Sequence, residues 1–117
     1  MVLTGDKSGS GTNANVFITL FSGSKSGLNS GQMQLKQKGK NLFERGQVDV
    51  FEVESVDLGD VDKIRIEHDN SGLFSDWYLA QVQVTNLETN KQWSFPCNQW
   101  LSKMKGDGKT WKDISAV

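Results

Sequence analysis

The stretch Phe43-Glu44-Arg45-Gly46-Gln47-Val48-Asp49-Val50-Phe51 says most about the fold of this sequence. Glycines punctuate residues 39–46, and apolar residues then alternate with polar and acidic ones through residues 48–54. A period of two places Phe51 and Val53 on one face of a strand and Glu52 and Glu54 on the other. We therefore expect a turn followed by a half-buried strand.

The same alternation continues on both sides of this stretch. Residues 15–22 are apolar on both faces, which predicts a central strand, whereas the other runs have one polar face. These other strands are expected at residues 32–36, 62–69, 77–87, 92–96 and 110–114. The apolar phase slips near Ala80-Gln81, where a β-bulge would reconcile it. Residues 98–104 could form one helical turn. Short strands between glycine-rich turns predict an all-β sandwich or barrel.

Length and composition limit the classes of protein that fit. The chain has 117 residues, enough for one domain with its own core. No apolar run approaches the roughly 20 residues of a membrane-spanning helix, and residues 1–15 lack the pattern of a signal peptide. The single Cys97 excludes an intramolecular disulfide and suits a reducing compartment. A net charge of −1 argues against a nucleic-acid partner.

The charges are unevenly distributed along the chain. Residues 49–62 contain six acidic side chains and no Lys or Arg. Lysines cluster on either side of them, at residues 36–40 and 103–112. Solvated faces are the ordinary interpretation of such runs. The functional alternative is that a lysine cluster borders a surface that faces anionic lipid.

Several other motifs accompany the opening stretch in a fixed order. They are Thr4-Gly5-Asp6-Lys7-Ser8-Gly9-Ser10-Gly11-Thr12-Asn13-Ala14-Asn15-Val16, Leu58-Gly59, Ile64-Arg65-Ile66, Trp77-Tyr78-Leu79 and Phe95-Pro96-Cys97-Asn98-Gln99-Trp100-Leu101. Together with Phe43-Glu44-Arg45-Gly46 they resemble the PLAT domain, also called the lipoxygenase-homology or LH2 domain. The resemblance covers roughly residues 3–113. Each motif is weak alone, and their shared order makes the resemblance specific.

The resemblance implies a fold and a kind of function. PLAT domains are antiparallel, C2-like β-sandwiches, so we expect two sheets of about four strands in a single domain over residues 1–117. PLAT domains have no active site of their own. They place larger proteins on a membrane or a partner, often with calcium, and the resemblance implies the same role here. Only Met1-Val2-Leu3 precede the first loop, which suggests a module taken from a longer protein.

The resemblance also implies two candidate calcium sites. The first would use Gly9, Gly11, Asn13 and Asp69, and the family's aspartate is here Asn13, which should weaken binding. The second would use Asn41 and Glu44. Calcium prefers about six to eight oxygen ligands of these kinds. The alternative is that Asn13 and Asp69 cap turns through the backbone, and that Glu44 and Arg45 have structural roles.

Three apolar residues are candidates for contact with lipid. Leu73 and Phe74 lie in a polar turn where lipoxygenase members often carry large apolar residues, so we expect them to be exposed. Trp100 matches another aromatic position of the family, and we expect it to be partly buried. The alternative for all three is a place in the core, which we expect for Trp77 and Trp93.

Catalysis is not expected of this chain. The single histidine, His68, shares a strand face with Ile64 and Ile66, so a core role is favoured over a ligand or a base. The chain has no zinc-binding set and no nucleophile elbow. We expect a cytoplasmic, peripheral membrane module that docks, with calcium, on a lipid surface or a membrane-associated protein. The alternatives are a calcium-independent protein-interaction module and a regulatory fragment of a lipoxygenase or lipase.

Overall fold

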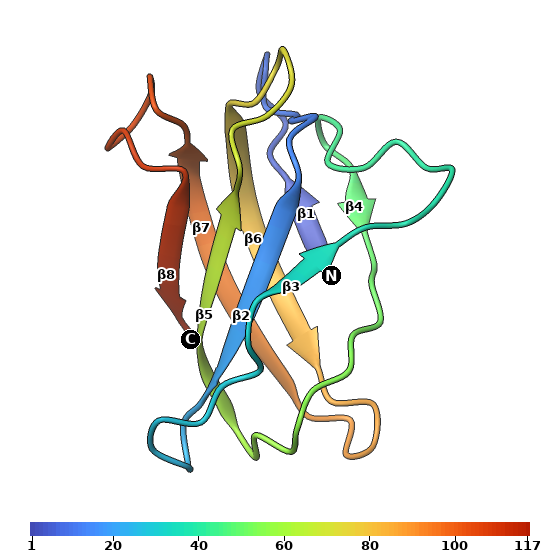
Figure 1. Ribbon diagram of the computed structural model, residues 1–117, viewed down its shortest axis with the longest axis vertical. Helices are drawn as coiled ribbons and strands as arrows, with labels where there is room; N and C mark the ends of the chain where they lie inside the picture. The colour runs from blue at the N-terminus through green and yellow to red at the C-terminus, as the bar shows by residue number, and fades with distance from the viewer.

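The computed structural model describes residues 1–117, which form eight β-strands and no helix. The strands are β1 (Val2–Thr4), β2 (Val16–Ser22), β3 (Met33–Leu35), β4 (Val48–Asp49), β5 (Val61–His68), β6 (Trp77–Thr85), β7 (Gln92–Leu101) and β8 (Trp111–Ser115). They form two antiparallel sheets, sheet A in the order β4-β1-β6-β7 and sheet B in the order β3-β2-β5-β8. The sheets lie face to face (Figure 1), which confirms the predicted sandwich. No helix of the structure could cross a bilayer.

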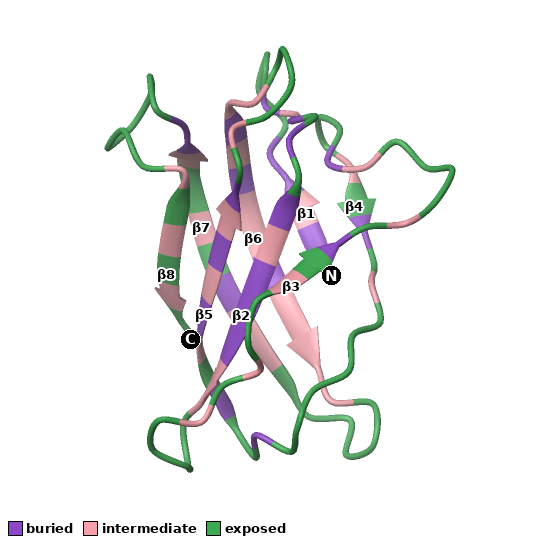
Figure 2. Ribbon diagram, in the orientation of Figure 1, coloured by how far each residue is buried: buried purple, intermediate pink, exposed green.

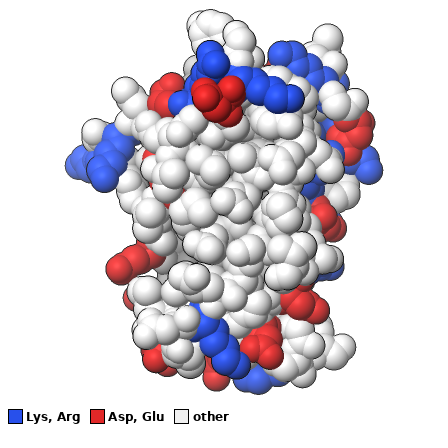
Figure 3. Space-filling view, turned by 180° about the vertical axis from the view of Figure 1, so that it is seen from behind, with Lys and Arg blue, Asp and Glu red and all other residues white.

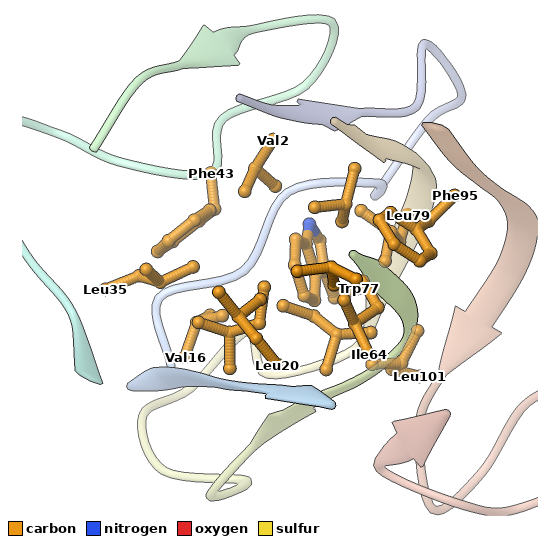
Figure 4. Close-up of a cluster of buried hydrophobic side chains, with 14 of the residues drawn as sticks. Val2, Val16, Leu20, Leu35, Phe43, Ile64, Trp77, Leu79, Phe95 and Leu101 are labelled. Atoms are coloured by element: carbon orange, nitrogen blue, oxygen red, sulfur yellow. The ribbon is translucent and has the colours of Figure 1, made fainter. Parts of the chain in front are cut away.

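The core lies between the two sheets because each strand directs alternate side chains inward. In β5, Ile64 and Ile66 are fully buried, while Arg65 between them faces outward. Figure 2 shows this alternation as bands of buried and partly exposed residues along the strands. Trp77 lies in the middle of the core (Figure 4), and its indole N–H donates to the Thr4 hydroxyl at 3.0 Å. This hydrogen bond satisfies the one polar atom of a large buried ring.

The predicted irregularity in β6 is present. The pairing of β6 with β7 shifts register between Leu79 and Gln81, beside the expected position. Leu79 and Val82 are both buried, although they lie an odd number of residues apart. The extra residue therefore keeps both ends of a long strand in phase with the core.

Two local predictions were wrong. The strand predicted over Val48–Glu54 ends at Asp49, and Val53 is 42% exposed rather than inward-facing. Only Val2 and Leu3 of β1 pair with β4, so residues after Asp49 have no adjacent strand. The helical turn expected at 98–104 is also absent, because β7 continues to Leu101 and pairs with Trp77. In both places the available pairing partner decided the structure.

The opening stretch forms a tight bend at the edge of the core. Phe43 is buried with a φ of 57°, a left-handed conformation uncommon for a bulky residue. Its N–H donates to the buried carboxylate of Asp49 at 2.9 Å, and its ring meets Trp77 edge-on at 5.4 Å. Asp49 also accepts a hydrogen bond from Gln47. These contacts hold a backbone conformation that the side chain would otherwise disfavour.

Both ends of the chain are attached to facing residues of sheet A. The Met1 amino group donates to the Gln83 carbonyl at 2.8 Å, and the Val117 N–H donates to the Ser94 carbonyl at 3.0 Å. Gln83 and Ser94 are directly paired across β6 and β7. The two ends therefore lie on opposite sides of one strand pair.

The outer faces of the two sheets differ in charge. The strands of sheet A contain no Lys or Arg, and their one acidic residue, Asp49, is buried. Figure 3 shows the resulting uncharged centre of this side of the molecule, with charges confined to its ends and margins. Sheet B carries charges on its surface, including the ion pair between Arg65 and Asp113 at 2.7 Å.

Candidate calcium and membrane site in the loops

Four loops meet at one end of the sandwich, at the top of Figure 1. They are residues 5–15, 36–47, 69–76 and 102–110, which connect β1 to β2, β3 to β4, β5 to β6 and β7 to β8. Between them lies a hollow of about 640 Å³, which we call the loop hollow. Its lining is Gly9, Ser10, Gly11, Thr12, Asn13, Glu44, Arg45, Leu73, Phe74, Ser75, Asp76, Met104 and Lys105. Four of the six predicted calcium ligands and both tip residues thus surround one space.

The bend of the opening stretch holds the first of these loops in place. The Thr12 N–H donates to the Phe43 carbonyl at 3.0 Å, and the Gly46 N–H donates to the Gly5 carbonyl at 3.0 Å. A Cβ on Gly11 would lie 3.0 Å from the Phe43 carbonyl oxygen, so glycine permits this approach. The bend thereby sets Glu44 beside the glycines of the first loop.

Arg45 has the structural role that was its alternative interpretation, because it forms an ion pair. Its Nε lies 3.0 Å from a carboxylate oxygen of Asp6 in the first loop. Both side chains are largely exposed, so this pair adds little to stability. The ion pair links the two loops and does not involve the Glu44 carboxylate.

Asn13 joins the first loop to the loop that carries Leu73 and Phe74. Its N–H donates to the Phe74 carbonyl at 3.0 Å, and its side-chain oxygen accepts from the Phe74 N–H at 3.2 Å. A Cβ on Gly72 would lie 2.3 Å from that same oxygen. Asn13 therefore has the capping role that was its alternative interpretation, and its oxygen already has a donor.

Asp69 has a similar capping role outside the loop hollow. Its carboxylate accepts hydrogen bonds from the Ser71 hydroxyl and N–H and from the side-chain amide and N–H of Asn15, at 2.6–3.1 Å. The bonds from Ser71 and then Asn15 hold the pKa of the Asp69 carboxyl well below its ordinary value. Asp69 and Asn41 are both absent from the lining of the hollow. The structure therefore does not bring these two residues to the other four.

The lipid-contact candidates behave as predicted in their exposure. Leu73 is 90% exposed and Phe74 is 74% exposed, whereas Trp100 is partly buried against Tyr78 with ring centroids 5.2 Å apart. We call Leu73 and Phe74 the apolar tip. Met104 is 86% exposed on a neighbouring loop and was missed. The sequence carried a signal for it, because Met104 is an apolar residue between two lysines in a polar, glycine-containing turn.

His68 is the last residue of β5 and lies at the base of the loop formed by residues 69–76. It is buried, its Nε2–H donates to the Leu101 carbonyl at 2.7 Å, and its Nδ1 accepts from the Asn70 N–H at 2.9 Å. The Asn70 donor requires an unprotonated Nδ1, which fixes the neutral tautomer. Burial lowers the pKa of the His68 imidazole below its ordinary value. The histidine is thus a satisfied core residue, as expected.

Cys97 is only partly buried, and this burial raises the pKa of its thiol. A raised pKa disfavours the reactive thiolate. The structure contains no cluster of three His, Cys, Asp or Glu side chains that could hold a metal ion. Any cation in the loop hollow would depend on backbone and amide oxygens in addition to Glu44 and Asp76.

Known structures share this fold. The chain superposes on a coral 8R-lipoxygenase with a TM-score of 0.83 at 24% sequence identity, covering 98% of this chain and 16% of that one. Calcium activates that lipoxygenase via a C2-like domain. A calcium-dependent 11R-lipoxygenase gives a TM-score of 0.68 at 30% identity, covering 98% of this chain and 16% of that one.

Sequence comparison identifies the family. Lipoxygenase homology domain-containing protein 1 of Mus musculus is 46% identical over 114 residues, which is 97% of this chain. The chain spans only 5% of that relative's length. The family model for the PLAT/LH2 domain matches residues 1–111. The chain therefore belongs to the PLAT/LH2 domain family.

Proposed function

We propose that this domain is a non-catalytic targeting module that docks on a membrane surface through its loop end, with calcium assisting. The apolar tip is the observation that carries the proposal. Leu73 and Phe74 are adjacent and largely exposed, and two hydrogen bonds between Asn13 and the Phe74 backbone hold their loop in place. Exposed apolar groups on a braced loop are typical of a binding surface.

The surroundings of the tip favour anionic lipid. Lys7 and Lys105 are exposed at the same end, with their amino groups over the rings of Tyr78 and Trp100 at 4.2 Å each. Lysines beside inserting apolar groups add electrostatic attraction to acidic headgroups. Met104 extends the apolar surface of the hollow's rim. The domain would thus rest on the membrane with Leu73, Phe74 and Met104 in the interface.

The proposal includes a calcium ion bound in the loop hollow. Gly9, Gly11, Asn13 and Glu44 supply only oxygen donors around the hollow, which suits a hard cation. A bound calcium would supply positive charge beside the Glu44 and Asp76 carboxylates. Asp69 and Asn41 could join only after a change in the loops, because neither residue lines the hollow and the Asp69 oxygens already accept hydrogen bonds. We therefore expect weak binding.

Vesicle co-sedimentation tests both parts. Vesicles with and without phosphatidylserine are each mixed with the domain in millimolar calcium or in chelator. We expect the largest bound fraction with phosphatidylserine and calcium, and a higher melting temperature in calcium, because a ligand of the folded state stabilises it. Equal binding in calcium and in chelator would contradict the proposal that calcium assists docking. No binding to any vesicle would contradict the proposal as a whole.

A calcium-independent protein-interaction module is the second candidate. The oxygens of Asn13 and Asp69 already accept hydrogen bonds within the loops, which favours a site that needs no ion. A regulatory fragment of a lipoxygenase or lipase is a third candidate, since the chain covers 16% of the lipoxygenases that it resembles. We infer no catalysis by the domain itself. Turnover of a lipid or ester by the isolated domain, lost on His68→Gln, would overturn that inference.

A further inference from the structure

A second exposed surface lies along the side of the sandwich, away from the loop end. Residues 50–57, which we call the edge segment, leave β4 at the open edge of sheet A. Figure 1 shows this part of the chain after β4 descending the side of the molecule toward the opposite end. It contains no turn or bend and belongs to no strand.

The backbone of the edge segment has few hydrogen-bond partners. None of its N–H or C=O groups bonds to another backbone group. Side chains reach only its ends, where Gln37 donates to the Val50 carbonyl, Lys25 donates to the Asp57 carbonyl at 3.1 Å and Ser55 donates to the Val56 carbonyl at 2.9 Å. Residues 51–55 therefore present their backbone N–H and C=O groups to solvent, as an open sheet edge does.

The sequence of the edge segment is that of a strand. Val50, Val53 and Val56 are β-branched and are 62%, 42% and 60% exposed. Phe51 stacks on Phe43 with ring centroids 5.7 Å apart, which fixes the segment against the core on one side. Natural sheet edges are commonly blunted by Lys, Pro or a bulge. The segment contains no Lys or Pro, so its acidic side chains are the one feature of its sequence that restricts which strand can pair with it.

Its charges indicate what kind of strand would pair with it. Glu52, Glu54 and Asp57 are exposed, and residues 49–62 contain no Lys or Arg. Opposite charges on facing strands stabilise pairing, and like charges destabilise it. Two copies of this segment side by side would bring carboxylates together, so a second copy of the chain is a poor partner.

We propose that the edge segment is a docking site for an extended peptide segment of another protein that carries Lys or Arg at alternate positions. The peptide adds a strand beside residues 51–55. Backbone hydrogen bonds provide the contact, and the carboxylates of Glu52 and Glu54 select the basic side chains. This surface is independent of the apolar tip and of calcium.

Hydrogen exchange tests the open edge, and a titration tests the partner. The probe is the peptide Lys-Val-Lys-Val-Lys-Val, with Glu-Val-Glu-Val-Glu-Val as the charge control and a central-proline version as the backbone control. In the free protein, amides 51–55 should exchange as fast as those of an unstructured peptide. The lysine peptide should slow them by about tenfold or more, and neither control should.

Two variants locate the interaction. Val53→Pro removes an N–H from the middle of the segment and should abolish binding of the lysine peptide. The double variant Glu52→Lys/Glu54→Lys should transfer binding to the glutamate peptide, whereas Glu88→Lys, a reversal at an exposed position outside the segment, should change nothing. Slow exchange of amides 51–55 in the free protein would overturn the proposal. So would dimerisation through this segment, or lysine-peptide binding that survives Val53→Pro.

Discussion

The apolar tip and the edge segment both expose large apolar side chains, but their backbones differ. At the tip, Phe74 donates and accepts backbone hydrogen bonds through Asn13, so only its side chain is free to bind. In the edge segment the backbone of residues 51–55 is itself unpaired. Exposed hydrophobicity alone therefore does not identify a partner. A lipid surface can use apolar side chains but cannot use unpaired amides, which a strand can satisfy.

The largest expected difference between the two regions is in vesicle binding. Replacing Leu73 and Phe74 together with Ser should weaken binding to phosphatidylserine vesicles by about tenfold or more. Burial of one such side chain contributes roughly 1.5–3 kcal/mol, and about 1.4 kcal/mol corresponds to one decade in affinity. Thermal unfolding should barely change, since both side chains are exposed. Val53→Pro is the matched control and should bind vesicles normally; equal loss in that variant would show that the regions are not separate.

The packing of Asn13 against the tip loop should contribute measurably to the free energy of unfolding. Gly72 has a φ of +81° and faces the Asn13 oxygen, so Gly72→Ala combines backbone strain with a steric clash. Gly27 has a φ of +76°, and a Cβ at this position would have no neighbour within 4 Å. Gly27→Ala therefore introduces backbone strain without a steric clash. We expect urea denaturation to give a loss of about 1–2 kcal/mol for Gly27→Ala and a clearly larger loss for Gly72→Ala. Equal losses would mean that Asn13 moves aside freely.

Acidification should loosen the tip without involving the edge segment. The pKa of His68 lies below its ordinary value of 6.5, so the unfolded chain takes up the proton first. Stability is full above about pH 6.5 and decreases as the pH falls below that value. Protonation of Nδ1 would also remove the acceptor of the Asn70 N–H, at the base of the tip loop. Denaturation curves between pH 7 and pH 5 should show this slope in the natural chain and a flatter profile in His68→Gln.

The smallest expected effect is that of Val53→Pro on folding. Its N–H has no partner and its side chain is 42% exposed, so the free energy of unfolding should change by less than about 0.5 kcal/mol. Differential scanning calorimetry of this variant and the natural chain makes the measurement. A strongly destabilised variant would show that the segment is part of the folded sheet, contrary to the open edge described above.

Most of the fold could be predicted from periodicity. The alternation of Ile64, Ile66 and His68 placed β5 correctly, and the phase slip near Ala80 revealed the bulge in β6. Periodicity failed where pairing was decisive, because it reports which face a side chain takes and not whether a partner strand exists. The segment after Asp49 has the composition of a strand but no neighbour within the chain.

The candidate site could be predicted only in part. Resemblance selected Gly9, Gly11, Asn13 and Glu44, which the structure brings around one hollow, but it could not reveal hydrogen bonds within loops. Asp69 forms its bonds with near neighbours in the fold, one of them Asn15, which lies 54 residues away in the chain. Met104 carried a local signal that was present in the sequence and was not used.

The attachment of Met1 to Gln83 and of Val117 to Ser94 makes this domain suited to circular permutation. The two ends flank one strand pair, so a short flexible linker across β6 and β7 could join them at the surface. New termini opened between Val53 and Glu54 would break no backbone hydrogen bond. Such a permutant would keep the loop end whole while freeing the edge for a fused strand of chosen sequence.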